Sequence, residues 1–335
     1  MKAIKFFAIS AMAAAMITSC SSEDELSQSN YPSDNIIRVT AGVNNAKTRA
    51  EGAGTPLKNP LSLTVVNKNE NATLAKKYTY VNKVFTKDDN GAWNCSETLL
   101  WQKDTQPVDI VAFAPAPNGK FNGVYAEGST QPIQSITYSV ADDQSTSSDN
   151  NDLLYYYAKD FKPGTSLVDK KLSIQFNHAF CMIDINVTLG TEFNKPNVLD
   201  DSPIIKVTLG GTKIAANVDV TNAASVVTAS GEATATDITT TNGSFTTAAD
   251  PEKNAISRFS CIAIPQTVAA NTFKVSLMTA GKRYEWTSAE PVELKSGYRY
   301  TLKLSMGNDV VLLKGGSISA TPWTEITSDK PLETD

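Results

Sequence analysis

Past residue 35, the chain consists of short runs in which apolar and polar residues alternate. A period of two places successive side chains on opposite faces and is typical of half-buried β-strands. We find no stretch with the period of an α-helix. Turn-forming pairs separate the runs, among them Asn90-Gly91, Pro163-Gly164 and Gly210-Gly211. Many short strands separated by turn-forming residues predict an all-β chain of β-sandwiches rather than an α/β architecture.

The length and the loop composition predict two domains. The 335 residues are enough for two domains of ordinary size. A polar loop at residues 141–152 is followed by a strand-like run, which ends at Pro163-Gly164. We therefore expect an N-terminal β-sandwich domain at residues 35–166 and a C-terminal one at residues 167–335.

The first alternating run, at residues 36–43, predicts a strand with one buried face. Burial of a large aliphatic side chain contributes ~1.5–3 kcal/mol. The strand is therefore expected to contribute much of the first domain's stability. Its apolar face consists of Ile37, Val39, Ala41 and Val43.

The longest strand pattern covers residues 171–189 and changes phase in its middle. Up to His178 the apolar face includes Leu172, Ile174 and Phe176, whereas after Phe180 it consists of Cys181, Ile183, Ile185 and Val187. Such a change predicts a bulge or bend that carries the strand past a sheet edge. His178 is the chain's single histidine. Without a partner motif, it is expected to be a hydrogen-bonded core residue rather than a catalyst or metal ligand.

Past the first twenty residues, the cysteine count does not fit a complete disulfide framework. The three cysteines are Cys95, Cys181 and Cys261, and each lies in an apolar or strand-like segment. Buried free thiols are the expectation. A Cys181–Cys261 disulfide is the alternative.

The sequence lacks recognisable catalytic and cofactor-binding motifs. It has no nucleophile elbow, no phosphate-binding loop and no dinucleotide fingerprint, and one histidine with dispersed cysteines does not make a zinc site. Residues 86–97 match a calcium-binding loop at several positions, but Thr86 stands where the first carboxylate belongs. Asn90-Gly91 between alternating runs favours a hairpin turn instead. We expect no metal, no cofactor and no enzymatic activity.

The charge balance excludes one class of partner. The formal net charge is −5 and the pI is about 5.1, without a basic stripe. Nucleic acids and anionic membrane faces select basic patches, so neither is expected as a partner.

The beginning of the chain resembles the signal of a bacterial lipoprotein. Lys2 and Lys5 precede an apolar run at residues 6–17, which is shorter than the ~20 residues of a membrane-spanning helix. The sequence Ile17-Thr18-Ser19-Cys20 resembles a lipobox, where cleavage before the cysteine is followed by acylation with chains such as palmitate. An ordinary secretory signal is the alternative. We expect a signal peptide at residues 1–19, lipid attachment at Cys20, and an acidic tether at residues 20–34 whose serine-plus-acid start resembles an export tag for the outer face of the outer membrane.

Four motifs in succession are similar to those of the fimbrillin family, the subunits of type V pili and their relatives. They are the lipobox, "KTRAEG", "NDLLYYYA" followed by "KLSIQFNHAFCMIDINV", and "SISATPW". Together they span essentially the whole chain. The resemblance implies two tandem transthyretin-like β-sandwich domains, in agreement with the strand pattern.

The resemblance also implies a mechanism of assembly. An arginine-directed protease cuts near the start, the strand before the cut leaves its domain, and a strand from another subunit takes its place. The matching arginine is Arg49, because Arg38 lies inside the strand pattern. The candidate donor strand contains Val310, Val311, Leu312, Leu313 and Ile318; the alternative is that these residues form the last strands of the C-terminal domain.

The resemblance, with the lipobox and the strand pattern, therefore implies a structural subunit or anchor of a cell-surface fimbrium that contributes to adhesion. Its expected partners are other fimbrial subunits and, through the lipid, the outer membrane. The alternative is a surface lipoprotein that binds a glycan or a host protein through its β-sandwiches. Trp93 and Trp286 are the candidate sugar-stacking residues for that alternative.

Overall fold

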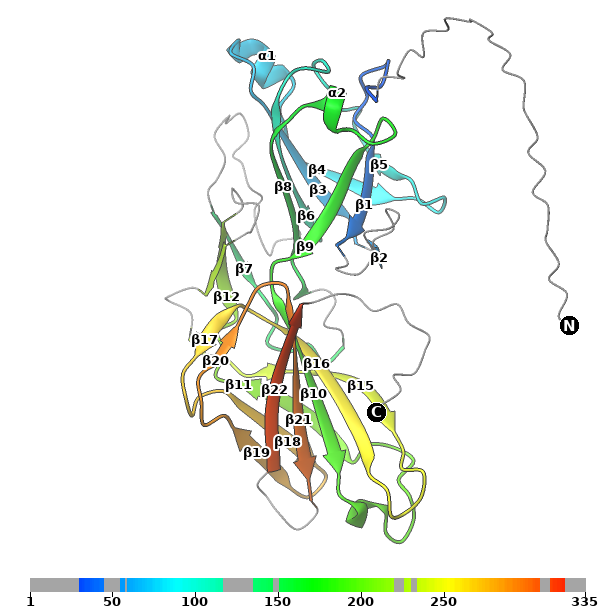
Figure 1. The fold of residues 1–335 in the computed structure, drawn as a ribbon, viewed down its shortest axis with the longest axis vertical. Helices are drawn as coiled ribbons and strands as arrows, with labels where there is room; N and C mark the ends of the chain where they lie inside the picture. Colours follow the sequence, from blue (N-terminus) through cyan, green and yellow to red (C-terminus); the bar gives the residue numbers. More distant parts are fainter. Residues whose placement is uncertain are drawn as a thin grey trace, which may run out of the picture.

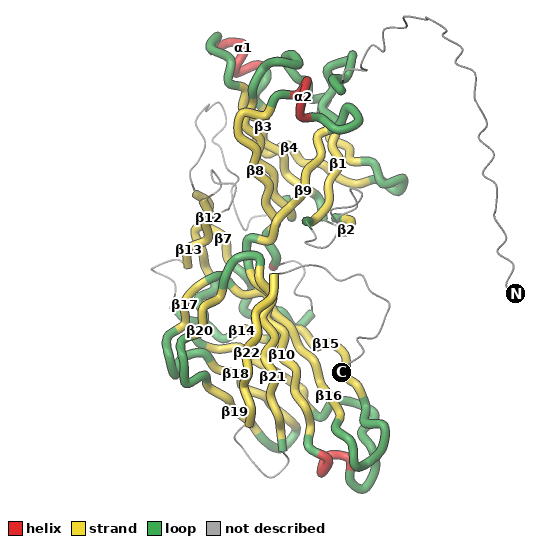
Figure 2. The backbone as a smooth tube through the Cα atoms, in the orientation of Figure 1, coloured by secondary structure: helices red, strands yellow, loops and turns green. Residues whose placement is uncertain are grey.

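The computed structural model is nearly all β, and this confirms the predicted fold class (Figure 1). Figure 2 shows strands along both of its lobes, which are stacked along the longest axis. The structure describes residues 30–44, 55–57, 59–116, 135–146, 151–219, 226–229, 234–307 and 314–322.

The upper lobe is built on an eight-stranded sheet with the order β2-β1-β9-β8-β6-β3-β4-β5. Its strands are β1 (Val39–Val43), β2 (Thr55–Pro56), β3 (Leu61–Asn67), β4 (Tyr80–Lys87), β5 (Trp93–Cys95), β6 (Val108–Ala114), β8 (Leu154–Phe161) and β9 (Leu172–His178). Two short helices interrupt the described strands, α1 (Ala72–Lys77) and α2 (Pro163–Ser166), in a chain whose sequence shows no helical periodicity. The Asn71 side chain caps α1 by accepting hydrogen bonds from the amides of Thr73 and Leu74, a local signal that is independent of helical periodicity.

The sheet of the upper lobe curls so that its two ends meet. Ile36, just before β1, forms an antiparallel bridge with Leu100, just after β5. The inner side holds one hydrophobic core, while Val66, Val111 and other residues on the opposite side belong to the core of the lower lobe. The central strand β3 is consequently buried at every position.

The lower lobe contains two main sheets, with the orders β15-β16-β10-β21-β22 and β14-β11-β18-β19. Smaller sheets are formed by β13-β12-β7 and by β17-β20. A 3₁₀ turn follows β10 at Thr191–Asn194. The strands are β7 (Ser135–Ser139), β10 (Cys181–Leu189), β11 (Ile204–Gly210), β12 (Ala215–Asp219), β13 (Val226–Ala229), β14 (Ile238–Thr239), β15 (Thr241–Thr246), β16 (Ala255–Ala263), β17 (Gln266–Val268), β18 (Lys274–Thr279), β19 (Arg283–Thr287), β20 (Val292–Leu294), β21 (Tyr298–Met306) and β22 (Lys314–Pro322).

The predicted phase change marks the place where the chain passes from one lobe to the other. β9 ends at His178 in the upper sheet, and β10 begins at Cys181 in the lower one, with a bend between them. The buried face of β10 is Cys181, Ile183, Ile185, Val187 and Leu189, as the pattern predicted apart from the additional leucine. The bend prediction is confirmed.

The predicted domain boundary after residue 166 is wrong, because two strands belong to the lobe on the other side of it. β9 lies beyond it but is hydrogen-bonded to β1 and β8 in the upper sheet. β7 lies before it but pairs with β12 of the lower lobe. Pro163-Gly164 begins helix α2 instead of a linker, and the Gly164 amide donates to the Asp104 carbonyl at 2.8 Å.

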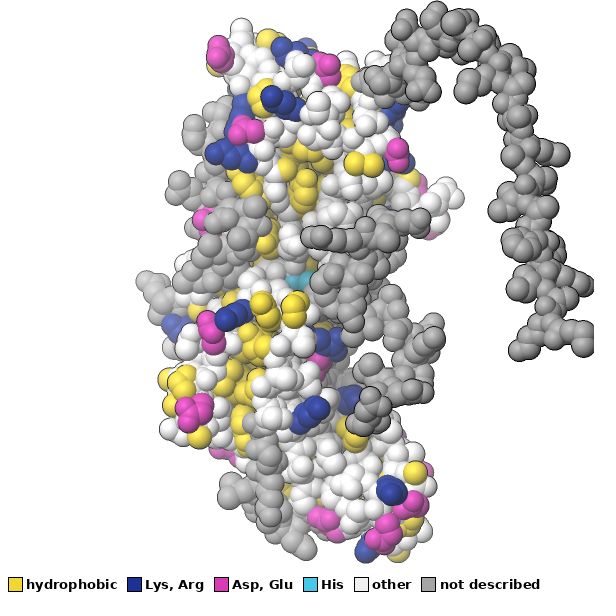
Figure 3. Space-filling view, viewed as in Figure 1, with side chains coloured by type: hydrophobic (Ala, Val, Ile, Leu, Met, Phe, Trp, Pro, Cys, Tyr) yellow, Lys and Arg dark blue, Asp and Glu magenta, His cyan; other side chains and the backbone are white. Residues whose placement is uncertain are grey.

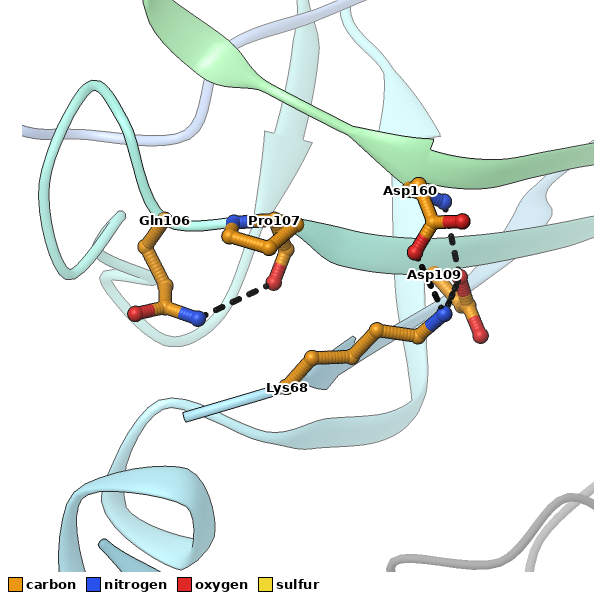
Figure 4. A network of polar contacts seen from close by, with 5 residues as sticks. All are labelled: Lys68, Gln106, Pro107, Asp109 and Asp160. Atoms are coloured by element: carbon orange, nitrogen blue, oxygen red, sulfur yellow. Dashed lines mark hydrogen bonds and ion pairs between the residues drawn. The ribbon is translucent and has the colours of Figure 1, made fainter. Parts of the chain in front are cut away.

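A polar network secures an irregular point between β6 and β8 (Figure 4). Lys68 Nζ lies 2.8 Å from Asp109 Oδ1 and 2.7 Å from Asp160 Oδ1, and Asp109 also accepts from the Asp160 amide at 2.9 Å. Asp160 has a φ of 53°, beside the register shift of the two strands. Burial lowers the pKa of Lys68, but the hydrogen bonds to both carboxylates raise it overall. The three charges are therefore satisfied by one another and have a structural role.

The hairpin predicted at Asn90-Gly91 is confirmed. Residues 88–92 connect β4 and β5, and Gly91 has a φ of 84°, in the left-handed region that glycine tolerates. Asp88 Oδ1 accepts from the amides of Asn90 and Ala92, so this carboxylate serves the turn. Among the described residues no cluster of metal ligands occurs, and no helix is long and apolar enough to cross a membrane.

The thiols of Cys181 and Cys261 are both free and fully buried, so the alternative of a disulfide is not realised. The two residues lie on neighbouring strands, where Ile183 is the direct partner of Cys261. Cys181 Sγ donates to the Ala263 carbonyl at 3.2 Å. Burial raises the pKa of both thiols well above the usual value.

These two thiols are expected to resist modification until the lower lobe unfolds. In a chain of residues 21–335, dithionitrobenzoate should react quickly with the half-buried Cys95 and with the other two only in denaturant, since the thiolate is the reactive form. A Cys95→Ser variant serves as the control and should show no fast phase. Rapid reaction of all three native thiols would contradict this expectation.

Candidate functional site

Among the described residues, the first strand, β1, has one long neighbour in its sheet. It runs parallel to β9 and pairs Val39 with Leu172 and Val43 with Phe176. The ends of this pairing are tied by the Leu172 amide donating to the Arg38 carbonyl at 2.8 Å and by the Asn44 amide donating to the Phe176 carbonyl at 2.7 Å. On the other side, within the described residues, β1 pairs only with the two residues of β2.

The segment in front of β1 closes the curled sheet. The Ile37 amide donates to the Leu99 carbonyl at 2.9 Å, and the Trp101 amide donates to the Asn35 carbonyl at 2.8 Å. Residues 35–43 therefore connect two ends of one sheet. Their departure would open the upper lobe along its length.

The side chains predicted to form the buried face lie in the core. Ile37, Val39 and Val43 are each no more than 5 % exposed, and Ala41 is half-buried. They belong to the inner core of the upper lobe together with Ile174 and other residues of β9. The strand is therefore held by side-chain burial as well as by backbone hydrogen bonds.

An exposed ion pair stands at the entrance to this strand. Arg38 donates from both terminal nitrogens to the Asp34 carboxylate, at 2.9 and 2.6 Å. The hydrogen bond to Arg38, with a further one from the Ile36 amide, holds the pKa of Asp34 well below its usual range. Exposed pairs contribute little to stability, so the pair orients the chain entering β1.

The candidate donor segment is only partly described. β22 pairs with β21 at the edge of the five-stranded sheet, so residues 314–322 occupy the last strand of the lower lobe. Ile318 is half-buried, whereas the side chains of Ser319, Ala320, Thr321 and Pro322 are exposed. Backbone hydrogen bonds to β21 are therefore the main attachment of this strand. Cys20, Arg49 and the donor candidates Val310, Val311, Leu312 and Leu313 lie outside the described residues.

His178 lies at the joint between the lobes and not in a reactive site. Its side chain is 4 % exposed, and its Nδ1 lies 2.7 Å from Asp152 Oδ2. The prediction of a hydrogen-bonded core histidine is confirmed. The two candidate tryptophans are far apart in the fold, with Trp93 on β5 of the upper lobe and Trp286 on β19 of the lower lobe.

A protein-family model described as fimbrillin-like matches residues 48–323. The chain belongs to the fimbrillin-like family. No curated protein matches the sequence of this fimbrillin-like chain significantly.

Solved structures share the fold of this fimbrillin-like chain at low sequence identity. A candidate cell adhesion protein from Bacteroides ovatus is 18% identical, with a TM-score of 0.60 over 88% of this chain and 99% of the other. A fimbrial protein from Bacteroides vulgatus is 15% identical, with a TM-score of 0.54 over 86% of this chain and 99% of the other. The C-terminally truncated tip fimbrial protein Mfa3 from Porphyromonas gingivalis is 10% identical, with a TM-score of 0.50 over 86% and 99%.

Some residues that hold the first strand of this fimbrillin-like chain were not identified from the sequence. Leu99 and Trp101 are buried, and their backbones are hydrogen-bonded to the segment in front of β1. Their spacing around Leu100 is a period-two signal, but it covers too few residues to stand out. The pairing of β1 with β9 carries no local signal, because the two strands are more than 100 residues apart in sequence.

Proposed function

We propose that this chain is a structural subunit or anchor of a cell-surface fimbrium and that it joins its neighbours by strand exchange. Family membership supports the fimbrial role. The observation that carries the exchange mechanism is the position of β1, which is buried in the core yet has one long neighbour. A strand of this kind is both necessary to its lobe and replaceable by another strand.

The proposed trigger is cleavage at Arg49. This residue follows β1 and precedes β2 in the sequence, so a cut there severs the covalent link between the strand and the rest of the lobe. Departure of β1 then leaves the edge of β9 unpaired and apolar side chains uncovered. Both features favour addition of a strand from another chain.

The proposed donor is the C-terminal segment of a neighbouring subunit. Val310, Val311, Leu312 and Leu313 are a continuous apolar run, as a strand buried on both faces requires. β22, with Ile318, follows it and is weakly covered in its own lobe. Its release therefore uncovers little apolar surface.

We further propose that acylation of Cys20 attaches the chain to the outer membrane, with the acidic tether of residues 20–34 exposed at the cell surface. Two or more acyl chains are needed for stable anchorage. Labelled palmitate should be incorporated by the wild-type chain and not by a Cys20→Ala variant. Equal labelling of both would refute the anchor.

An arginine-specific protease tests the exchange mechanism. Treatment of a chain of residues 21–335 should cut after Arg49 and give polymers on size-exclusion chromatography. The other arginines, Arg38, Arg258, Arg283 and Arg299, lie in or beside paired strands, and a matched Arg49→Lys chain should remain uncut. A stable cleaved monomer that retains its first strand would exclude assembly as a shaft subunit, although the anchor role would remain.

A further inference from the structure

The lower lobe contains an open pocket, apart from the place that β1 fills in the upper lobe. Its volume is about 540 Å³, within the size range of small-molecule sites. The pocket lies between β19, the connection to β20, and the two strands β21 and β22. Figure 3 shows hydrophobic side chains exposed on this lobe, along the left side of the view.

The pocket exists because β22 extends past the opposing sheet. Ile318 pairs with Leu302, and Ala320 pairs with Tyr300. The side chains of Leu302 and Tyr300 face the core, and directly paired residues point to the same side of a sheet, so those of Ile318 and Ala320 also point inward. The opposing four-stranded sheet ends at β19, within the described residues. The inner face of β22 is therefore left without a covering strand, and Ala320 is exposed there.

Aromatic and aliphatic side chains form the walls of the pocket. Trp286 is half-buried, and its ring is fixed against Phe273 in an edge-to-face contact with centroids 6.3 Å apart. Tyr300 is 4 % exposed, and its hydroxyl accepts from the Lys295 amide at 2.8 Å. Both rings are positioned by contacts made without a ligand, so a bound molecule meets a preformed surface.

Carboxylates stand beside this aromatic surface. Glu290 and Glu293 line the pocket and are exposed. Glu293 pairs with Lys295 at 3.1 Å, whereas Glu290 has no ion-pair or hydrogen-bond partner for its carboxylate among the described residues. Ser288 is buried and donates to the Glu290 carbonyl at 2.7 Å, which fixes the backbone that carries this carboxylate.

We propose that this pocket binds a neutral sugar, one hexopyranose ring at the end of a glycan. One face of such a ring presents C–H groups with partial positive charge, which suit the negative face of Trp286. The hydroxyl groups at its rim are donors for the Glu290 carboxylate, and such charge-assisted hydrogen bonds are the stronger kind. The site gives the chain an adhesive contact for as long as β22 stays paired with β21.

The charges of the pocket argue against other occupants. An anionic sugar would place its carboxylate beside Glu290 and Glu293, where like charges repel. An apolar side chain from a peptide strand would remove water from the Glu290 carboxylate without supplying a hydrogen bond, which is costly. A neutral polyhydroxylated ring satisfies both the aromatic wall and the carboxylates.

Saturation-transfer NMR on the chain of residues 21–335 tests this proposal. The probes are the methyl glycosides of β-D-galactose, β-D-glucose and α-D-mannose, with N-acetylneuraminic acid as the anionic comparison. We expect saturation transfer to at least one neutral probe, with a Kd on the order of 1 mM, as suits a single ring. N-acetylneuraminic acid should show none.

Matched variants assign the binding to the pocket. Trp286→Ala should weaken binding by about tenfold or more, which corresponds to about 1.4 kcal/mol. Glu290→Gln should weaken it by about threefold to tenfold, a loss of one charge-assisted hydrogen bond. Glu290 is exposed and unpartnered, so this variant keeps the fold even if loss of the Phe273 contact destabilises Trp286→Ala. Trp93→Ala, in the other lobe, should bind as the wild type does.

The proposal is overturned if no neutral probe binds at its highest soluble concentration. It is equally overturned if binding is unchanged in both pocket variants, or if N-acetylneuraminic acid binds better than the neutral probes. A synthetic peptide GSISATPW that binds at the pocket where sugars do not would identify a strand as the occupant instead. The sugar-binding outcomes do not bear on polymer formation, so the fimbrial role is tested separately.

Discussion

A chain that begins at Ala50 is expected to lose most of the stability of its upper lobe. This truncation removes Ile37, Val39 and Val43, which are almost fully buried. At ~1.5–3 kcal/mol for each, the loss is roughly 5–9 kcal/mol, before any contribution from backbone hydrogen bonds. A whole domain is stable by only about 5–15 kcal/mol. Urea unfolding followed by circular dichroism should show an early transition that is missing from the chain of residues 21–335.

Adding the missing strand as a peptide should restore the upper lobe. A peptide of residues 30–44 supplies the pairing with β9 and the contacts with residues 99–101. The matched control is the same peptide with Val39→Asp and Val43→Asp, which keeps the backbone but cannot enter the core without burying charges. Recovery with the native peptide alone is expected. A truncated chain as stable as the longer one would show that β1 is dispensable, and the exchange mechanism would then be lost.

The strand at the centre of this prediction could be recognised from the sequence because its two sides differ. Ile37, Val39 and Val43 face the core, while Arg38 and Thr40 are exposed. The alternation is therefore visible in the sequence itself. β3 is buried at every position, and only part of its pattern alternates. Local patterns thus indicated that a strand exists, and they did so best where one side of it meets water.

The partners of each strand could not be predicted in the same way. β1 pairs with β9 and β7 pairs with β12, and these contacts cross the chain over distances that leave no local signal. The boundary at residue 166 was inferred from Pro163-Gly164, a turn-forming pair that in fact begins a short helix inside the upper lobe. Turn residues show where an element ends. They do not show to which sheet the next element belongs.

The two candidate sites differ in how far the sequence revealed them. The first strand and Arg49 were indicated by a resemblance and a period-two pattern. The pocket beside Trp286 depends on β22 extending beyond β19, and these two strands belong to different sheets. Trp286 was a candidate for stacking on sugar, but its neighbours Tyr300 and Glu290 could not be assigned to it without the fold.

The joint between the lobes is expected to be as sensitive to mutation as the first strand. Phe180 lies in the bend between β9 and β10 and is fully buried. Its ring lies 5.2 Å from that of Tyr138, and its carbonyl accepts from the Gly297 amide at 2.9 Å. The residue belongs to a core that also contains Val111 and Tyr155 of the upper sheet. The ring therefore packs at the point where the cores of the two lobes are continuous.

Phe180→Ala should lower the free energy of unfolding by about 3–5 kcal/mol, the cost of a large cavity in a well-packed core. Phe180→Leu, which keeps most of the volume, should cost clearly less, and Phe245→Ala, at a half-buried position on β15, provides a second comparison. Because the core at Phe180 is shared, the alanine variant is also expected to separate one unfolding transition into two, measured by urea titration with near-ultraviolet circular dichroism. If Phe180→Ala shifted the midpoint no more than Phe245→Ala does, the bend would be a mere connection between independent lobes, and removal of β1 would leave the lower lobe unaffected.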